Sequence, residues 1–276
     1  MTDYSSAFPR ALDLLTNGEI TEAVLQCLDY CAHTKNNSDI LDALCNLKEF
    51  HSYAEYEQLK ITLLLCSHYK FEDDNAVEGL KSYSLLAGFR WKPPIMILAG
   101  GTDKSIENEM HAYQQLLLEA FSKFEGTIIS GGTKAGIAAL AGDLGQHYPN
   151  KITCIGFLPS KEFTKERTDL NQARYQELVF SETSQKFDLR PVLQYWIELA
   201  LNNIKKLDIK LLGINGGKIS AFEYRLALLL GVNIGIISDS GREADNLAMD
   251  KYWGNKENLE FIPYQNQQRI ANFLTK

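Results

Sequence analysis

The sequence predicts a Rossmann-like α/β fold, a parallel sheet with helices on both faces, preceded by a small all-helical N-terminal region. Short apolar runs alternate with helical patterns from Pro94 onward, as in sheets whose strands are buried on both faces. Glycine-rich turns follow four of these runs, whereas the first 90 residues show helical spacing only. We therefore expect a helical module over residues 1–90 and a nucleotide-binding sheet domain over residues 94–276.

The helical module is predicted from the spacing of its apolar residues. Residues 5–33 follow a helical pattern that a turn at residues 16–19 interrupts. Residues 36–50 form a second amphipathic stretch, with Asn37 or Ser38 as the N-cap, and residues 54–69 form a third. Since none of these stretches has catalytic spacing, we expect the module to contact a partner effector or to mediate oligomerisation.

The sheet domain begins where Pro93 and Pro94 end any preceding helix. Strands are expected over residues 95–99, 126–130, 152–158, 209–214, 232–238 and 259–263. Helices are expected over residues 105–124, 135–148, 191–206, 221–231 and 242–253. The remaining long segment, residues 159–188, is polar and is predicted to form a flap over the strand ends.

Composition and charge exclude several classes of protein. The formal net charge of −7 argues against a nucleic-acid coat or a membrane-surface binder. No apolar run approaches the roughly 20 residues that a membrane-spanning helix needs, and the first residues lack the basic and apolar stretches of a secretory signal. We expect a cytoplasmic protein without nucleic-acid or membrane partners.

The cysteines and histidines indicate no metal site. Cys27 and Cys31 share a helical face, but His33 is their only nearby candidate co-ligand. Buried, reduced thiols are the simpler interpretation. The histidines are scattered without paired spacing, so we expect no metal and no required cofactor.

Four predicted strand-to-helix loops each combine glycine, a small hydroxyl residue and one cation. They are residues 99–105, 130–136, 215–220 and 238–245, and the cations are Lys104, Lys134, Lys218 and Arg242. Ligands of open α/β sheets bind at the carboxyl ends of the strands, where all four loops should emerge. Glycine allows close approach of the backbone to an anion, and the following helix starts favour negative charge.

These loops predict a site for a nucleotide-type ligand. Lys134, Lys218 and Arg242 would neutralise its phosphates. Glu223 or Asp239 would accept a hydrogen bond from a ribose hydroxyl. No Walker motif and no clean G-x-G-x-x-G occurs, which disfavours an ordinary ATPase or NAD dehydrogenase. The expected ligand-binding residues are Gly100, Gly101, Thr102, Lys104, Ser130, Gly131, Gly132, Thr133, Lys134, Gly136, Asn215, Gly216, Gly217, Lys218, Ser220, Glu223, Asp239, Ser240, Gly241 and Arg242.

The motifs "SGGTKAGIAALAG", "IGFLP" and "NGGKISAFE", in this order, resemble the SLOG superfamily. That superfamily includes LOG-type phosphoribohydrolases, DprA-type proteins and the cytosolic N-terminal domains of TRPM channels. The resemblance covers roughly Pro94 to the end, and "SDSGREADNLA" is most similar to the TRPM branch. It implies a sensor that binds ADP-ribose or a cyclic ADP-ribose derivative. Pairing of LOG-type relatives through helices beside the site implies a homo-oligomer.

The resemblance also implies an enzymatic alternative. The LOG motif P-G-G-x-G-T-x-x-E aligns with residues 215–223, so that Glu223 takes the place of the catalytic carboxylate. Asn215, Ile219 and Ser220 replace the proline, the third glycine and the threonine. The arginine that these enzymes carry on the preceding helix has no counterpart in residues 194–206. These departures favour a binding protein over a phosphoribohydrolase.

Three hypotheses follow from the sequence. The first is a ligand sensor. The second is an N-glycosidic-bond hydrolase that uses Glu223, with Arg167, Arg174 or Arg190 as its cation. The third is an interaction protein that has kept the fold and lost the ligand. Trp91, Trp196 and Trp253 are expected in the core rather than as platforms for base stacking.

Overall fold

The fold is built on a parallel sheet of seven strands. The structure, a computed structural model, describes residues 10, 13–14, 17–33, 54–86, 88–164, 170–181 and 187–275. The strands lie in the order β4-β3-β2-β1-β5-β6-β7, and all six neighbouring pairs are parallel. Their bounds are β1 Ile95–Gly100, β2 Gly126–Ser130, β3 Ile152–Leu158, β4 Glu177–Phe180, β5 Ile209–Ile214, β6 Asn233–Ser238 and β7 Leu259–Pro263.

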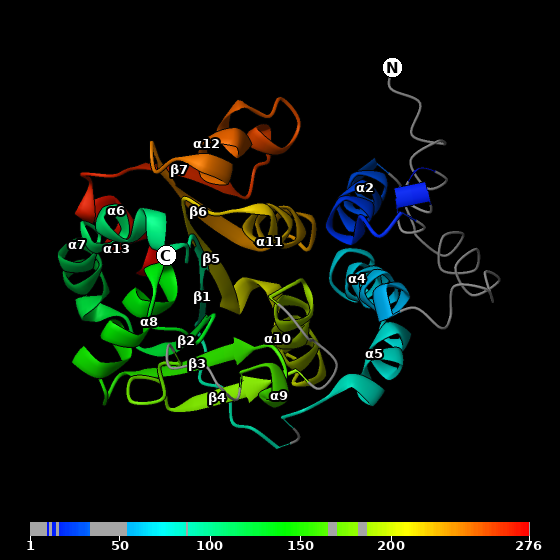
Figure 1. The fold of residues 1–276 in the computed structure, drawn as a ribbon, viewed down its shortest axis with the longest axis horizontal. Coiled ribbons are helices and arrows are strands. Elements are labelled where there is room, and N and C mark those ends of the chain that lie inside the picture. Colours follow the sequence, from blue (N-terminus) through cyan, green and yellow to red (C-terminus); the bar gives the residue numbers. More distant parts are fainter. Residues whose placement is uncertain are drawn as a thin grey trace.

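Helices cover both faces of this sheet, which confirms the predicted fold class (Figure 1). One face carries α6 (Glu107–His111), α7 (Gln114–Ala120), α8 (Gly136–His147) and α13 (Gln267–Thr275). The other carries α10 (Arg190–Leu201) and α11 (Lys218–Leu229), with α12 (Arg242–Met249) following β6. Helix α9 (Lys161–Thr164) is short. Turns of 3-10 helix lie at Lys81–Tyr83, Lys104–Ile106, Phe121–Lys123, Lys206–Asp208 and Trp253–Asn255.

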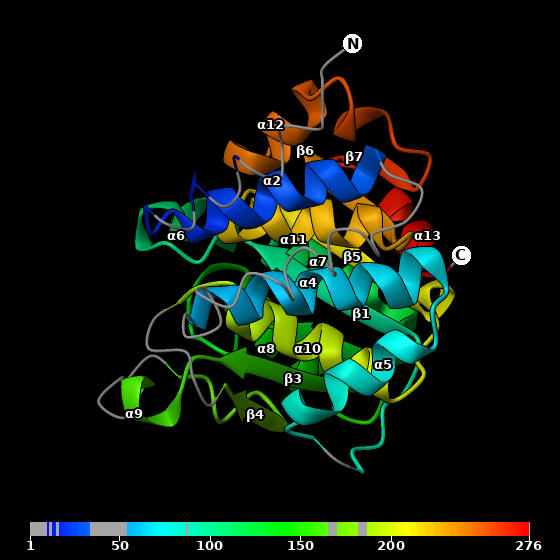
Figure 2. The same ribbon diagram turned by 90° about the vertical axis from the view of Figure 1, so that its right-hand side faces the viewer.

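The N-terminal helices form a further layer outside α10 and α11 (Figures 1 and 2). They are α2 (Ile20–His33), α4 (Ala54–Phe71) and α5 (Asn75–Leu80). Helix α2 packs on α11 and α4 packs on α10, and their apolar side chains join the core on that side of the sheet. The stretch predicted over residues 36–50 lies outside the described residues. The division of the chain at residue 90 stays a prediction.

The predicted flap over residues 159–188 is wrong in part, because it contains a strand. Residues Glu177–Phe180 form β4, which pairs with β3 at the edge of the sheet. Only Val179 of this strand is buried, so its sequence lacks the continuous apolar run of the inner strands. The helix predicted over residues 105–124 is also broken, into α6 and α7, by a turn at Ala112 and Tyr113.

Buried side chains confirm other expectations about the core. Trp196 and Trp253 are buried, and Trp91 is partly buried against the same core. Four cysteines of the described residues are free and buried, namely Cys27, Cys31, Cys66 and Cys154.

Within the described ranges, no three His, Cys, Asp or Glu side chains are grouped so that they could hold a metal ion. Nor does any helix there have the length and apolar character to cross a bilayer.

Candidate ligand-binding site

Two cavities open at the carboxyl edge of the sheet, one on each side of the loop between β5 and α11. The first, the α10 cavity, has a volume of about 350 Å³ and lies between the ends of β1 and β2 and helix α10. It lies where the strand order reverses between β1 and β5, which is the usual ligand position in this architecture. Its lining includes seven of the predicted residues: Gly100, Thr102, Ser130, Gly131, Thr133, Ser220 and Glu223.

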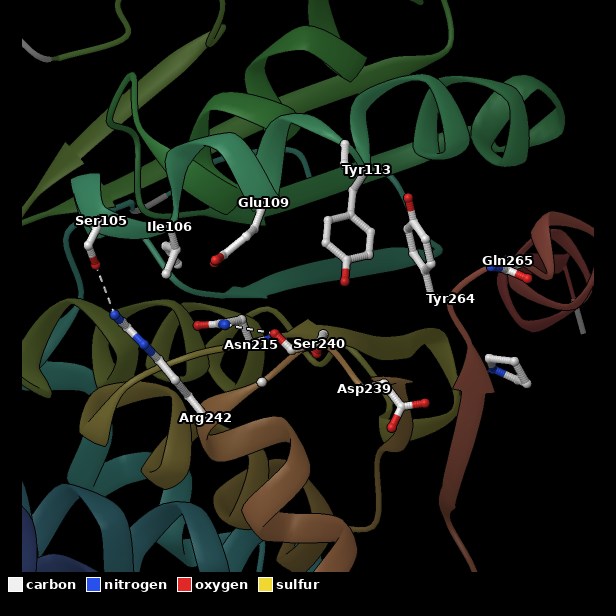
Figure 3. Close-up of a pocket in the computed structure, with 13 residues that line it drawn as sticks. Ser105, Ile106, Glu109, Tyr113, Asn215, Asp239, Ser240, Arg242, Tyr264 and Gln265 are labelled. Carbon is white, nitrogen blue, oxygen red and sulfur yellow. Dashed lines mark hydrogen bonds between the residues drawn. The ribbon is translucent and has the colours of Figure 1, made fainter.

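The second cavity, the α6 cavity, has a volume of about 1000 Å³ and lies between α6 and the loops after β6 and β7 (Figure 3). Its lining includes five predicted residues: Asn215, Asp239, Ser240, Gly241 and Arg242. The structure therefore divides the predicted set, which the sequence placed around one ligand. The α6 cavity is the larger and has the start of α12 in its lining, but the α10 cavity holds the buried carboxyl group and the starts of α8 and α11.

Glu223 is the buried carboxyl group of the α10 cavity. It lies on α11, is 8% exposed, and its Oε1 accepts a 2.6 Å hydrogen bond from the hydroxyl of Tyr195 on α10. Burial raises the pKa of Glu223 to about 7, although the Tyr195 hydrogen bond acts in the opposite direction. Near neutral pH the group can therefore hold or release a proton, as a general acid or base must.

The starts of α8 and α11 face the α10 cavity. Ala135 and Ile137 line it at the start of α8, and Ile219 and Ser220 line it at the start of α11. Neither helix has a side-chain N-cap. Because the first N–H groups of a helix have no acceptor within it, these two starts offer positive dipole ends and N–H donors to a ligand. At α8 the Ile137 N–H is not among these donors, because it is bonded to the Gly101 carbonyl.

The glycines of the two motifs have different roles. Gly136 has a φ of +54°, and a Cβ there would collide with the carbonyl oxygen of Gly101. That oxygen accepts a 2.9 Å hydrogen bond from the Ile137 N–H, so this contact joins the β1 loop to α8. Gly217, in contrast, has an extended backbone, and a Cβ there would meet nothing within 4 Å. Gly136 is required for packing, whereas Gly217 keeps the space before α11 open.

Asn215 braces the β5 loop against the β6 loop. Its side-chain amide donates a 2.7 Å hydrogen bond to the Ser240 carbonyl, and its backbone N–H donates to the Ser240 hydroxyl at 2.8 Å. That hydroxyl in turn donates to the Ile237 carbonyl at 2.7 Å. The polar groups of Asn215 and Ser240 that were expected to bind a ligand are therefore engaged in holding the loops together.

The predicted phosphate-binding cations do not meet in the α10 cavity. Lys218 pairs with Glu22 on α2, and Arg242 donates a 3.1 Å hydrogen bond to the Ser105 hydroxyl at the α6 cavity. Lys134 is exposed and lines neither cavity. The side chain of Lys104 lies outside the described part of the structure. The remaining predicted residues, Gly101, Gly132, Gly136, Gly216 and Gly217, shape the loops without lining either cavity.

The cations considered for a hydrolase are also placed elsewhere. Arg174 pairs with Asp143 on α8. The Arg190 guanidinium lies over the Tyr83 ring at 5.2 Å, with Nη1 4.0 Å from Oε2 of Glu57. Arg167 lies outside the described residues.

Several lining residues were not predicted from the sequence. Tyr195, Asp188, Phe187 and Asp103 join the α10 cavity, and Tyr113, Tyr264 and Glu109 join the α6 cavity. Asp103 lies within one of the four predicted loops, so its position next to a glycine motif could have identified it as a lining residue. The others come from helices and segments whose approach to the strand ends is set by packing and not by local sequence.

The parallel sheet and the helices on both its faces define a Rossmann-like domain. The chain belongs to the family described as "SLOG in TRPM, prokaryote", whose sequence profile matches residues 93–272. This confirms the resemblance to the SLOG superfamily. A comparison with curated proteins found no match.

Two solved structures share a similar arrangement at low identity. One, a structural-genomics target designated TM1055, is 17% identical with a TM-score of 0.44, and the match covers 64% of this chain and 98% of that one. The other is the molybdenum cofactor carrier protein of Chlamydomonas reinhardtii, at 12% identity and a TM-score of 0.47, covering 67% of this chain and 99% of that one. Neither similarity is strong enough to support an inference about this chain.

Proposed function

We propose that the protein is a sensor that binds a nucleotide-derived ligand, of the ADP-ribose or cyclic ADP-ribose type, in the α10 cavity. The observation that supports this most directly is the meeting of two uncapped helix starts with a buried carboxyl group in one cavity. The helix starts suit the phosphates of such a ligand. The carboxyl group of Glu223 can accept a hydrogen bond from a ribose hydroxyl. Membership of the family supports the ligand class.

The charge of the α10 cavity indicates how the phosphates would be bound. Its described lining contains Asp103, Asp188 and Glu223 and no lysine or arginine. Phosphates would therefore depend on backbone N–H groups at the glycine loops and on the dipoles of α8 and α11. Such binding requires the ligand to place its phosphates close to the helix starts and its hydroxyl groups near Glu223.

The N-terminal helices are suited to report on occupancy of the cavity. Helix α10 presents Tyr195 to the cavity, while the adjacent Trp196 packs edge-on against Tyr69 of α4 at 6.0 Å between ring centroids. Helix α11 begins at the cavity, and its Lys218 pairs with Glu22 of α2. A shift of the start of α10 or α11 on ligand binding would therefore alter the contacts of these helices with α4 and α2.

An N-glycosidic-bond hydrolase is the second candidate, and the raised pKa of Glu223 favours it. A buried carboxyl group with a pKa of about 7 resembles a general acid or base. Against this candidate, Arg174 and Arg190 have partners away from the cavity. The sensor is therefore the better-supported function.

A thermal-shift screen with product analysis tests both candidates. Purified protein is heated with AMP, NAD, ADP-ribose or cyclic ADP-ribose, and the ligand is then examined by chromatography. We expect a rise in Tm with an intact ligand, because a ligand that binds only the native state stabilises it. Release of a free base that is lost in Glu223→Gln would instead establish the hydrolase. No shift with any of these compounds would contradict both.

A further inference from the structure

The α6 cavity contains polar groups that its own loops leave without partners. Tyr113 is 7% exposed, and its hydroxyl points into the cavity (Figure 3). This hydroxyl makes no hydrogen bond to any residue that the structure describes. The side chain is more than nine-tenths buried, but its hydroxyl opens to the cavity, so this group is available to a ligand.

Two carboxylates line the same cavity. Glu109 projects from α6 into the cavity, and Asp239 lines it at the end of β6 (Figure 3). In the described ranges neither forms an ion pair. The only guanidinium among the described lining residues, that of Arg242, lies at the other end of the cavity against Ser105. The described lining of the cavity therefore carries two exposed carboxylates and one guanidinium.

Burial is the main cause that raises the pKa of Tyr113 to about 12, and nearby carboxylates, among them Asp245, Glu109 and Asp239, act in the same direction.

The aromatic walls of the cavity add a second feature. Tyr113 and Tyr264 meet edge to face, with ring centroids 4.9 Å apart and ring planes at 76°. Two rings at right angles present the face of one ring and the edge of the other to the same space. A cation is attracted to the face of an aromatic ring. Tyr264 is 37% exposed, so its ring is accessible from the mouth of the cavity.

We propose that the α6 cavity is a binding site for an organic cation that carries amino groups, such as a polyamine. Ammonium groups would donate to Glu109, Asp239 and the Tyr113 hydroxyl, and the methylene chain would lie along the tyrosine rings. The site is separate from the proposed nucleotide site, because Glu109, Tyr113 and Asp239 do not line the α10 cavity. Either proposal can fail without the other.

Calorimetric titration with spermidine tests this proposal. We expect Glu109→Gln and Tyr113→Phe each to raise the Kd by about tenfold, which corresponds to about 1.4 kcal/mol. Glu107→Gln is the matched control, because Glu107 lies on the same helix, is exposed and does not line the cavity. Its Kd should equal that of the unmodified protein, which excludes general attraction to an acidic surface.

Further measurements keep the proposal falsifiable. Asp239 has a φ of 57°, which asparagine tolerates, so Asp239→Asn is expected to fold and to weaken spermidine binding. Absence of spermidine binding would overturn the proposal, as would equal affinity in Glu109→Gln and Glu107→Gln. Binding of adenosine without binding of spermidine would assign the cavity to neutral nucleosides and would also overturn it.

Discussion

The hydroxyl of Tyr195 donates a 2.6 Å hydrogen bond to Oε1 of Glu223, and this bond joins α10 to α11 across the floor of the α10 cavity. Both side chains are buried. The bond favours the ionised carboxylate, while burial favours the protonated form, and burial prevails. The consequences of this balance can be measured.

The stability of the protein should fall as the pH rises through the range in which Glu223 ionises. The pKa of Glu223 is about 7 in the folded protein and 4.5 in its ordinary state, so the folded state binds the proton more tightly. The stabilisation is complete below about pH 4.5 and is lost as the pH rises through 7. The loss is on the order of 3 kcal/mol.

Urea unfolding at pH 5.5 and pH 8 measures this effect when Glu223→Gln is compared with the unmodified protein. The variant lacks the titrating group, so it should gain stability relative to the unmodified protein at pH 8. A difference between the two proteins that does not vary with pH would contradict the buried ionisation.

Removal of the Tyr195 hydroxyl should raise the pKa of Glu223 further. Tyr195→Phe keeps the ring that packs against Phe157 at 5.7 Å between centroids, but it removes the donor to the carboxylate. The pH at which Glu223 ionises, followed by NMR, is expected to move above 7. An unchanged or lower value would show that the hydrogen bond does not act on Glu223 as described.

Two glycines of the loop motifs should respond differently to alanine. Gly136→Ala must adopt a positive φ and place its Cβ against the Gly101 carbonyl, so we expect a loss of about 1–3 kcal/mol. Gly217→Ala has open space and an extended backbone, and the change should stay within about 0.5 kcal/mol. Urea unfolding measures both, and equal losses would be inconsistent with these roles.

Asn215 should matter mainly for holding the loops. Asn215→Ala removes the 2.7 Å bond to the Ser240 carbonyl and retains a positive φ of 60°, so we expect a loss of about 1–3 kcal/mol. Asn215→Gly removes the same bond without the backbone strain and should lose less. A larger loss in the glycine variant would show that the backbone conformation is not strained.

Lys218 should contribute little to nucleotide binding, despite its place in a glycine motif. Its side chain is 77% exposed and pairs with Glu22 instead of lining the α10 cavity. Lys218→Ala is expected to leave the midpoint of urea unfolding and the affinity for ADP-ribose unchanged, because exposed pairs contribute little. A strong loss of affinity would restore the role that the sequence suggested.

The sheet and the loops could be predicted from the sequence because their signals are local. The six longer strands carry apolar residues, and glycine-rich turns follow four of them. Strand β4 could not be predicted because only Val179 is buried within its four residues. Its place depends on the pairing with β3, which is a long-range interaction.

The site was predicted less completely for a similar reason. The loop residues were found because glycine, hydroxyl and cation occur together in each loop. The direction of a long side chain depends on the neighbouring helices, so Lys218 turns to Glu22 and Arg242 to Ser105. Tyr195 lies within an apolar helical pattern, and nothing in that pattern distinguishes it from a core residue until α10 is placed beside α11.

The central claim is that a nucleotide-derived ligand binds at the open start of α11 in the α10 cavity. Calorimetric titration of ADP-ribose into the unmodified protein and into Gly217→Val tests it most directly. A Cβ at position 217 would meet no atom within 4 Å, and a Val side chain there would stand beside the first N–H groups of α11, so we expect an unchanged Tm without ligand. The affinity should fall by about tenfold or more. Equal affinity in the two proteins, or no binding to either, would contradict the account.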